Sequence, residues 1–351
     1  MMTTTSSSGT AASVTIDTGE ILTPNSSAKR RNIFAGIGEP VALIGALVVL
    51  IAIFSALNPR FATLTNLQNV LNQASLPIII GVGATLVILI GSIDLSVEGV
   101  MAASGVAFVL MSANSRGGQD MGIAAFIVPV VLGTVLGALN GLIYTLLKVP
   151  SFIVTLGMWF IGFGIATILY GTDAYPELTD DNLTNWAAKI NLGLPNVFWL
   201  AAALVVVSAL VIRFTRFGRA ALAIGNNEDI ARANGMPVRK HKVTIFIIAG
   251  ALSGVAGILA TMQMGGTSNH IGEGYLFLTL PAVVIGGTSL AGGKGGVLRT
   301  FLGVILLTVL NNGLVLAGVS PNYQSALSGA ILVVAIVAAA WSQRGRLRIA
   351  K

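Results

Sequence analysis

Two acidic residues lie in the polar segment GSIDLSVEG, which separates two long apolar runs. Asp94 and Glu98 are four residues apart, so a helix through this segment would place both carboxyl groups on one face. Acidic groups at membrane depth are costly, and they often belong to proton or cation sites. In a second interpretation, Asp94 caps a helix whose first turn contains Ser96 and Glu98. Three roles therefore stay open: helix capping, a place on a transport path, and proton coupling.

Three asparagines, Asn140, Asn311 and Asn312, lie within apolar runs. A buried amide needs hydrogen-bond partners, and in membranes such residues commonly bond to a neighbouring helix. The alternative is that they line a path for a hydroxyl-rich solute. Glycines at every fourth position of residues 133–141 form a smooth stripe beside Asn140, which lets another helix approach closely.

No motif in the chain predicts catalysis. The loop GGTSLAGGKGG resembles a phosphate-binding loop, but Thr288 stands where the first glycine of that motif belongs, and Gly295 follows Lys294. We interpret it as a turn between closely packed helices and expect no nucleotide hydrolysis by this chain. There is no Cys, and His270 and Glu273 in a glycine-rich loop are too few for a metal site. We expect no catalytic residue, no metal and no cofactor.

The longest polar stretch between apolar runs is FGRAALAIGNNEDIARANGMPVRKHK, residues 217–242. Asn226 or Asn227 can cap a helix there, because a side-chain oxygen accepts from the first free N–H groups of a helix. The two acidic residues that follow would lie in the first turn, where negative charge is favourable. Gly235 favours a stop, since glycine readily takes the left-handed conformation. The stretch therefore predicts a short helix over 228–234.

Pro237 and several basic residues follow this short helix. Pro237 suits the first turn of a next helix, and Arg239, Lys240 and Lys242 would anchor that helix at the lipid head groups. The stretch is then either an interfacial loop that sets topology or a helix that docks on a partner. We favour docking, because a cap, an acidic first turn and a glycine stop are more than a linker requires.

The elements that must position these residues are long apolar helices. The 351 residues are 54% hydrophobic and 9% charged, with a mean hydropathy of +0.86, whereas a soluble domain has about 25% charged residues. The chain is therefore predicted to be an all-α integral membrane protein. About ten transmembrane helices are expected, over residues 41–57, 71–90, 100–112, 122–147, 152–170, 197–212, 243–262, 275–285, 297–316 and 324–341.

The basic residues predict the orientation of these spans. With both termini cytoplasmic, only Arg60, Arg116 and Lys189 lie outside, whereas the opposite orientation reverses this ratio. The net charge of +7 is then explained by membrane topology rather than by nucleic acid binding. The loop with His270 and Glu273 lies outside, where it is either solvated or in contact with an extracellular partner.

The two halves of the chain show a faint internal similarity. Asn140 and Asn311 are 171 residues apart, as are Pro150 and Pro321, in spans predicted to run in opposite directions. Inverted repeats are common in membrane transporters. Because Gly, Leu and Asn also recur by chance, an inverted repeat and a coincidence both stay open.

Four stretches together resemble the permease subunit of bacterial ATP-binding-cassette (ABC) sugar importers, the ribose, xylose, arabinose and galactose group. The resemblance covers about residues 40–341. In the usual family form of the first stretch, DLSVG, Gly follows Val, whereas Glu98 stands there in this chain, before Gly99. The four stretches are GSIDLSVEGVMA, VPSFIVTLGM, FGRAALAIGNNEDIARANGMPV and TLPAVVIGGTSLAGGKGGVLRTFLGVILLTVLNNGL.

The resemblance implies the ABC importer permease fold, in a permease dimer whose chains lack an ATPase site. Two ATPase sites would lie on a cytoplasmic partner, often on one tandem chain, and a soluble binding protein would deliver the sugar from outside. The family's coupling helix falls on GNNEDIARANG and would sit in a groove of the ATPase. The candidate coupling residues are therefore Gly225, Asn226, Asn227, Glu228, Asp229, Ala231, Arg232, Asn234 and Gly235.

We therefore expect import of a monosaccharide, pentose or hexose, across the cytoplasmic (inner) membrane, with ATP used by the partner subunit. The alternative is an ion-coupled secondary transporter of a small polar solute. The expected partners are a second permease copy, the ATPase, an extracytoplasmic sugar-binding protein and the lipid bilayer, but no nucleic acid. The candidate residues for the translocation path are Asp94, Ser96, Glu98, Asn140, Asn311 and Asn312.

Spans and resemblance together divide the chain into three parts. We expect a disordered cytoplasmic tail over residues 1–35, a transmembrane permease domain over 36–345 with a cytoplasmic coupling segment at 213–242, and a short cytoplasmic tail over 346–351.

Overall fold

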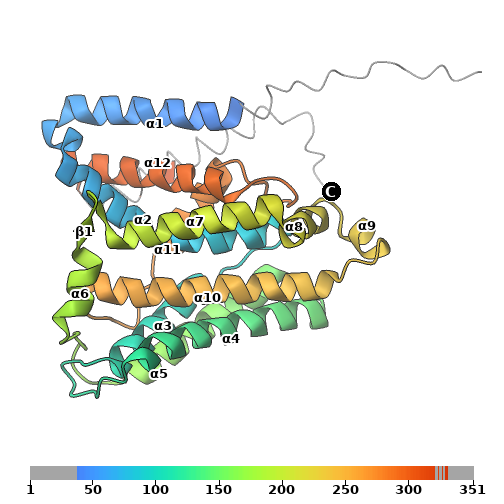
Figure 1. The fold of residues 1–351 in the computed structure, drawn as a ribbon, viewed down its shortest axis with the longest axis horizontal. Helices are drawn as coiled ribbons and strands as arrows, with labels where there is room; N and C mark the ends of the chain where they lie inside the picture. The colour runs from blue at the N-terminus through green and yellow to red at the C-terminus, as the bar shows by residue number, and fades with distance from the viewer. Residues whose placement is uncertain (1–37, 321–322, 324–325, 327–328, 331–351) are drawn as a thin grey trace, which may run out of the picture. The chain divides into compact units, whose positions relative to one another are not determined.

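Apolar runs form helices because a helix satisfies its own backbone hydrogen bonds where water is absent. This computed structural model describes residues 38–320, 323, 326 and 329–330, and they are mostly helical (Figure 1). The last predicted span and both predicted tails lie largely outside the described residues. The other predicted spans form α1 Gly38–Leu57, α2 Leu64–Leu89, α3 Val97–Met111, α4 Ile123–Leu147, α5 Ser151–Tyr170, α7 Asn196–Phe214, α10 Val238–Met264, α11 Tyr275–Ile285 and α12 Val297–Leu316.

Within the described residues, six helices are long and apolar enough to cross a membrane: α2, α4, α5, α7, α10 and α12. Shorter apolar helices are α1, α3 and α11. The predicted all-α membrane fold is thereby confirmed. One start was misplaced, because α2 begins at Leu64, well before residue 71. Thr63 caps it there, with its Oγ1 accepting the N–H of Asn66 at 3.2 Å.

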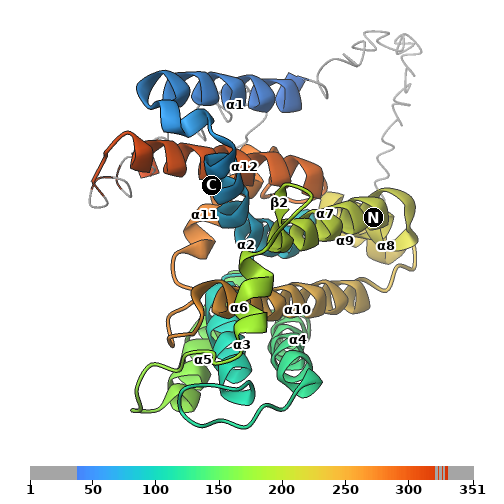
Figure 2. The same ribbon diagram turned by 60° about the vertical axis from the view of Figure 1, so that its left-hand side comes forward.

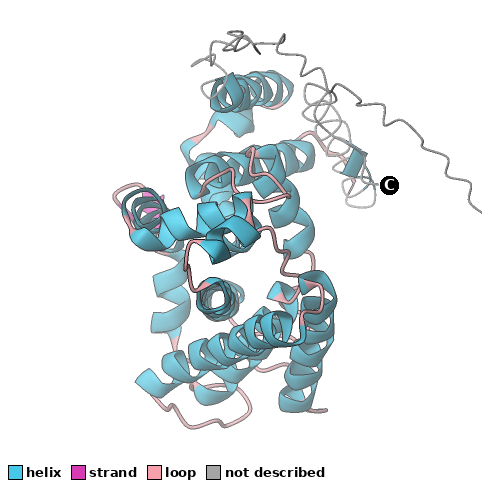
Figure 3. Cartoon of the chain, turned by 90° about the vertical axis from the view of Figure 1, so that its right-hand side faces the viewer, coloured by secondary structure: helices cyan, strands magenta, loops and turns pink. Residues whose placement is uncertain are grey.

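Short elements occupy the two ends of the helices. At one end lie α6 (Asp181–Ala188) and the antiparallel pair β1 (Ile190–Asn191) and β2 (Leu194–Pro195), in which Ile190 pairs with Pro195. At the other end lie α8 (Arg216–Asn226) and α9 (Glu228–Ala233), as Figure 1 shows. Figure 3 shows the β1–β2 hairpin in magenta among the helices. A 3-10 turn, Pro59–Ala62, joins α1 to α2.

The helix α10 has packing partners on two sides (Figure 2). It contacts α3 and α4 on one side and α2 on the other. The glycine stripe of α4 allows the α4 contact: a Cβ on Gly137 would lie 2.3 Å from the carbonyl oxygen of Phe246, and one on Gly133 would lie 2.5 Å from that of Gly250. The predicted close helix approach is thereby confirmed.

The contacts of the described helices follow the pattern of an inverted repeat. Helix α4 packs on α10 and α12 on α2, while the short helices α3 and α11 contact α10 and α2 respectively. Helix α4 ends beside α9, and α12 begins after a loop that bonds to the end of α8, so α4 and α12 run in opposite directions. Of the two interpretations of the Asn140 and Asn311 spacing, these contacts favour the repeat.

Candidate functional site

The polar stretch 217–242 contains most of α8, all of α9 and the start of α10, so a second short helix precedes the predicted one. Thr215 caps α8, with its Oγ1 accepting the N–H of Gly218 at 3.3 Å. Asn227 ends α8 and caps α9, because its extended backbone turns Oδ1 onto the N–H of Ile230 at 3.0 Å. Of the two predicted caps, Asn227 is therefore the one in use. Asn226 instead donates from Nδ2 to the carbonyl of Gly293 at 3.1 Å.

Helix α9 ends where the sequence predicts. Gly235 has a φ of 75°, a conformation that glycine adopts without strain, and α10 begins immediately after Pro237. Gly225 packs tightly between two backbone segments: a Cβ there would lie 1.9 Å from the carbonyl oxygen of Leu89 and 2.4 Å from the nitrogen of Gly293. Helix α8 is thus seated against the end of α2 and the loop before α12.

The outward face of α9 is open. Asp229, Ile230 and Asn234 are exposed, whereas Ala231 on the opposite face is buried. Ile230 exposes 60% of its surface, and it is not among the coupling residues predicted from the sequence. The sequence carries a signal for it, because Ile230 is the one large apolar residue of α9, and a helix that sits in a partner's groove is anchored by its apolar side chains.

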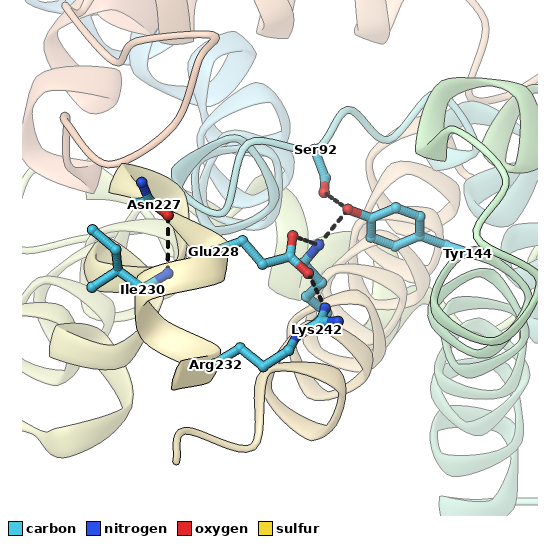
Figure 4. Close-up of polar contacts among 7 residues, drawn as sticks. All are labelled: Ser92, Tyr144, Asn227, Glu228, Ile230, Arg232 and Lys242. Carbon is cyan, nitrogen blue, oxygen red and sulfur yellow. Dashed lines mark hydrogen bonds and ion pairs between the residues drawn. The ribbon is translucent and has the colours of Figure 1, made fainter. Parts of the chain in front are cut away.

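A polar chain ties α9 to the membrane helices (Figure 4). Glu228 Oε2 accepts from Lys242 Nζ of α10 at 2.5 Å, and the same ammonium donates to Tyr144 Oη of α4 at 2.7 Å. Ser92, just beyond α2, donates to the same Tyr144 oxygen at 3.0 Å. The other oxygen of Glu228 accepts from Arg232 at 2.7 Å. One buried ammonium therefore links α9, α10 and α4.

Lys242 does not anchor α10 at lipid head groups, so that prediction is wrong. Its side chain is 7% exposed, and it lies over the ring of Tyr144 at 4.7 Å from the centroid. Burial by itself raises the pKa of the Glu228 carboxyl, but hydrogen bonds and charges from Lys242 and Arg232 outweigh burial and hold that pKa below its usual value. The Glu228 carboxyl is therefore ionised at neutral pH.

Asp94 belongs to a buried cluster with Ser96 and Asn140. Asp94 Oδ1 accepts from Ser96 N–H at 2.8 Å and from Ser96 Oγ at 2.6 Å, while Asn140 Nδ2 donates to Ser96 Oγ at 2.8 Å. Helix α3 begins only at Val97, so Ser96 is the residue before its first turn. Asp94 bonds to Ser96 and not to the first turn of α3. The prediction that Asp94 caps α3 directly is therefore wrong, and so is the prediction that Ser96 lies in the first turn of α3.

The backbone from Ile93 to Leu95 is non-helical and at least partly buried, so its N–H groups need side-chain acceptors. Ser151 Oγ accepts from Ile93 N–H and Thr155 Oγ1 accepts from Leu95 N–H, each at 3.0 Å. Ser151 and Thr155 are one helical turn apart on α5, and the two N–H groups are two residues apart. The stretch VPSFIVTLGM therefore supports GSIDLSVEG, a relation that was not predicted from the sequence.

Glu98 has different partners from Asp94. Its Oε1 accepts from the backbone N–H groups of Gly274 at 3.1 Å and Leu276 at 2.8 Å, and its Oε2 accepts from Trp159 Nε1 at 3.2 Å. It is 1% exposed. The first N–H groups of α11 have no helical acceptor, so Glu98 of α3 stabilises the start of α11. The two carboxyl groups do not share a helix face, because α3 starts after Asp94.

A cavity of about 1080 Å³ opens beside Glu98. Its polar lining comes from Gln73, Glu98, Trp159 and Asn311, and much of the remaining wall from Leu95 before α3 and from apolar residues of α5, α11 and α12. Gly99 of α3 packs on Trp159 and Gly162 near the middle of α5, and Gly272, just before α11, packs on Glu98. Helices α3 and α11 therefore both start about halfway along α5. Short helices that start beside a cavity at this depth are a feature of transporter binding sites.

The three predicted asparagines are therefore separated. Asn140 lies in the Asp94 cluster, Asn311 lines the cavity, and Asn312 accepts from Asn66 Nδ2 of α2 at 3.0 Å. The hydrogen bond between Asn66 and Asn312 is of the helix-to-helix kind that the first interpretation of the asparagines predicts.

The loop before α11 offers no metal site in the described residues. His270 and Glu273 are exposed and lie 3.3 Å apart. No group of three or more His, Cys, Asp or Glu side chains in the described part of the chain is suited to a metal ion.

Comparisons with known proteins agree with this architecture. The family described as "branched-chain amino acid transport system / permease component" matches residues 66–336. The ribose import permease protein of Escherichia coli strain K12 is 36% identical over 307 residues, which cover 86% of this chain and 94% of that protein. The D-allose transport system permease protein of the same strain is 34% identical over 293 residues, covering 83% and 88%. No solved structure matches the chain.

The galactose/methyl galactoside import permease protein of Haemophilus influenzae is also similar, with 30% identity over 311 residues that cover 84% of this chain and 92% of that protein. The family match extends from the first turn of α2 to beyond α12 and includes the cavity, α8 and α9. The chain therefore belongs to the family of permease subunits of bacterial ABC sugar importers.

Proposed function

We propose that this chain is the transmembrane subunit of an importer that carries a monosaccharide, a pentose or hexose, across the cytoplasmic membrane. The names of its relatives, which refer to ribose, D-allose and galactose, support this substrate class. ATP hydrolysis on a separate ATPase drives the import, and the chain itself contributes no nucleotide site or cofactor. The observation that carries the proposal is the ion pair between Glu228 and Lys242, which joins α9 to the membrane helix α10.

In this proposal α9 is the helix that docks on the ATPase. The exposed Asp229 and Ile230 face outward, and Asn227 and Gly235 fix both of its ends. A helix with fixed ends can transmit force as a rigid body. Lys242 passes the movement to α10 directly and to α4 through Tyr144. Gly225 and Asn226 transmit it to α2 and to the loop before α12.

The solute path runs through the cavity beside Glu98 and Asn311. Asp94, Ser96 and Asn140 hold the segment between α2 and α3, whose movement opens and closes the cytoplasmic side of that path. Asn312 acts at a distance by joining α12 to α2. A binding protein supplies sugar from outside, and a second copy of the permease completes the membrane unit. Both termini are cytoplasmic, on the side of α8 and α9.

The test is transport by purified components in proteoliposomes. The full assembly of permease, ATPase and binding protein should take up labelled D-ribose or D-galactose only when ATP is present on the side of the membrane where the ATPase lies. The permease alone should be inactive under a proton or sodium gradient. Gradient-driven uptake by the permease alone would instead establish the secondary-transporter alternative and overturn the proposal.

A further inference from the structure

The cavity contains one charged side chain that the usual form of the family does not predict. Glu98 stands where DLSVG has glycine, and its side chain is 1% exposed and lines the cavity. Burying a carboxylate in an apolar site is unfavourable unless it is hydrogen-bonded. Its presence beside a cavity therefore needs a physical explanation.

Bonding to α11 explains part of the role of Glu98. A carboxylate offers about four acceptor positions. Three are filled, by the N–H groups of Gly274 and Leu276 and by the indole of Trp159. The described contacts thus leave capacity for one more donor, at a residue in the cavity wall.

Trp159 supplies a second side chain of the cavity wall that can contact a solute. It lines the same cavity, and its ring makes edge-on contacts with Phe160 and Phe163, at centroid distances of 4.7 and 5.1 Å. These contacts and the hydrogen bond to Glu98 restrict the indole to one orientation. The C–H face of a sugar ring packs well on an aromatic surface, while its hydroxyl groups donate to a carboxylate. Gln73 and Asn311 add amide donors and acceptors to the wall.

We propose that Glu98 and Trp159 form a discrete binding site for a neutral, polyhydroxylated solute inside the permease, and that Glu98 determines its specificity. The inference rests on the proposed function, since it names what the path recognises. Carboxylate and indole act together: the indole takes the apolar face of the solute, and the carboxylate accepts a hydroxyl hydrogen. A solute that lacks a hydroxyl group at that position leaves the acceptor unpaired and binds more weakly.

The experiment measures binding to the purified full-length permease in nanodiscs, without ATPase or binding protein. D-ribose and D-galactose are titrated while tryptophan fluorescence is followed, and a Trp159→Phe variant identifies the contribution of Trp159. Glu98→Gln keeps the shape and one acceptor oxygen, and Glu98→Gly restores the family form. Glu273→Gln, an exposed residue of the loop before α11, is the matched control.

We expect a saturable signal from at least one sugar, about tenfold or more weaker in Glu98→Gln because a hydrogen bond to a charged group is lost, and unchanged in Glu273→Gln. No saturable signal from the wild type, or equal affinity in Glu98→Gln, would overturn the site. If Glu98→Gln does not fold, carbodiimide labelling of the wild type decides: bound sugar should protect Glu98, and equal labelling with and without sugar refutes the inference. ATP-driven uptake by the assembled importer together with failed binding would refute this site alone.

Discussion

The ion pair between Glu228 and Lys242 gives the most direct test of how α9 is connected to the membrane helices. Glu228→Gln removes the negative charge but keeps the size of the side chain. The buried ammonium of Lys242 then loses a charged partner and keeps the hydroxyl group and ring of Tyr144, with a neutral amide oxygen in place of the carboxylate. If the connection transmits movement, the variant should loosen α9 without unfolding the chain.

The expected magnitude follows from the exposure of the two partners. Removing one partner of a fully buried ion pair costs about 3–5 kcal/mol. The Lys242 side chain is 7% exposed, but that of Glu228 is 36% exposed, so water reduces the loss. We expect about 1–2 kcal/mol, which corresponds to a change of about 5- to 30-fold in the ratio of attached to detached α9.

The assay is the number of sugars imported per ATP hydrolysed by the reconstituted importer, together with amide hydrogen exchange in α9. Glu228→Gln should keep ATP hydrolysis, reduce uptake by up to the same 5- to 30-fold, and speed exchange in α9. Arg232→Gln is the matched control, because it removes the exposed partner of the same carboxylate and should cost only about 0.3–0.5 kcal/mol. Equal effects of the two variants, or wild-type coupling and exchange in Glu228→Gln, would refute the reasoning.

Three further predictions concern other parts of the chain. Gly137→Leu should prevent α4 from packing on α10 and reduce the yield of folded protein, whereas Gly164→Leu, which has open space around it, should fold normally in a detergent thermal-stability assay. Asp94→Asn should keep the melting temperature within a few degrees and retain uptake, since an amide oxygen can also accept from Ser96; loss of uptake in a folded Asp94→Asn protein would assign the charge a role in the path. The folded-state pKa of Glu228 lies below its unfolded value, so its ion pair should stabilise α9 fully above the unfolded pKa and be lost as pH falls through the folded pKa. Exchange in α9 should therefore not respond to this group between pH 6 and 8, and a change there that Glu228→Gln abolishes would contradict the assignment.

The helices and the ends of α9 could be predicted because both depend on residues close together in the chain. The hydropathy of about twenty consecutive residues identifies a membrane span, whatever the arrangement of the helices around it. The cap of Asn227 on Ile230 and the left-handed Gly235 involve only the helix itself. Lys242 was misassigned for the opposite reason. A lysine after a polar helix normally reaches the lipid head groups, and only the fold brings Glu228 and Tyr144 to its ammonium.

The pair Asp94 and Glu98 shows the same limit within one motif. Their spacing predicted two carboxyl groups on one helix face, but helix α3 begins between them. Asp94 therefore bonds locally to Ser96, while Glu98 reaches Trp159 and the start of α11, far away in the chain.

The sequence by itself determined that the chain is a helical membrane protein of an ABC sugar permease family, with a capped polar helix between two spans. These properties follow from the composition, from caps formed by residues close together in the chain, and from motifs of consecutive residues. The tertiary structure alone decided which polar groups meet: Glu98 with the first turn of α11, Lys242 with Glu228, and Ser151 and Thr155 with the non-helical segment before α3. The physical reason is that a buried polar group takes whichever partner packing brings within hydrogen-bond distance, and that partner is not specified by spacing along the chain.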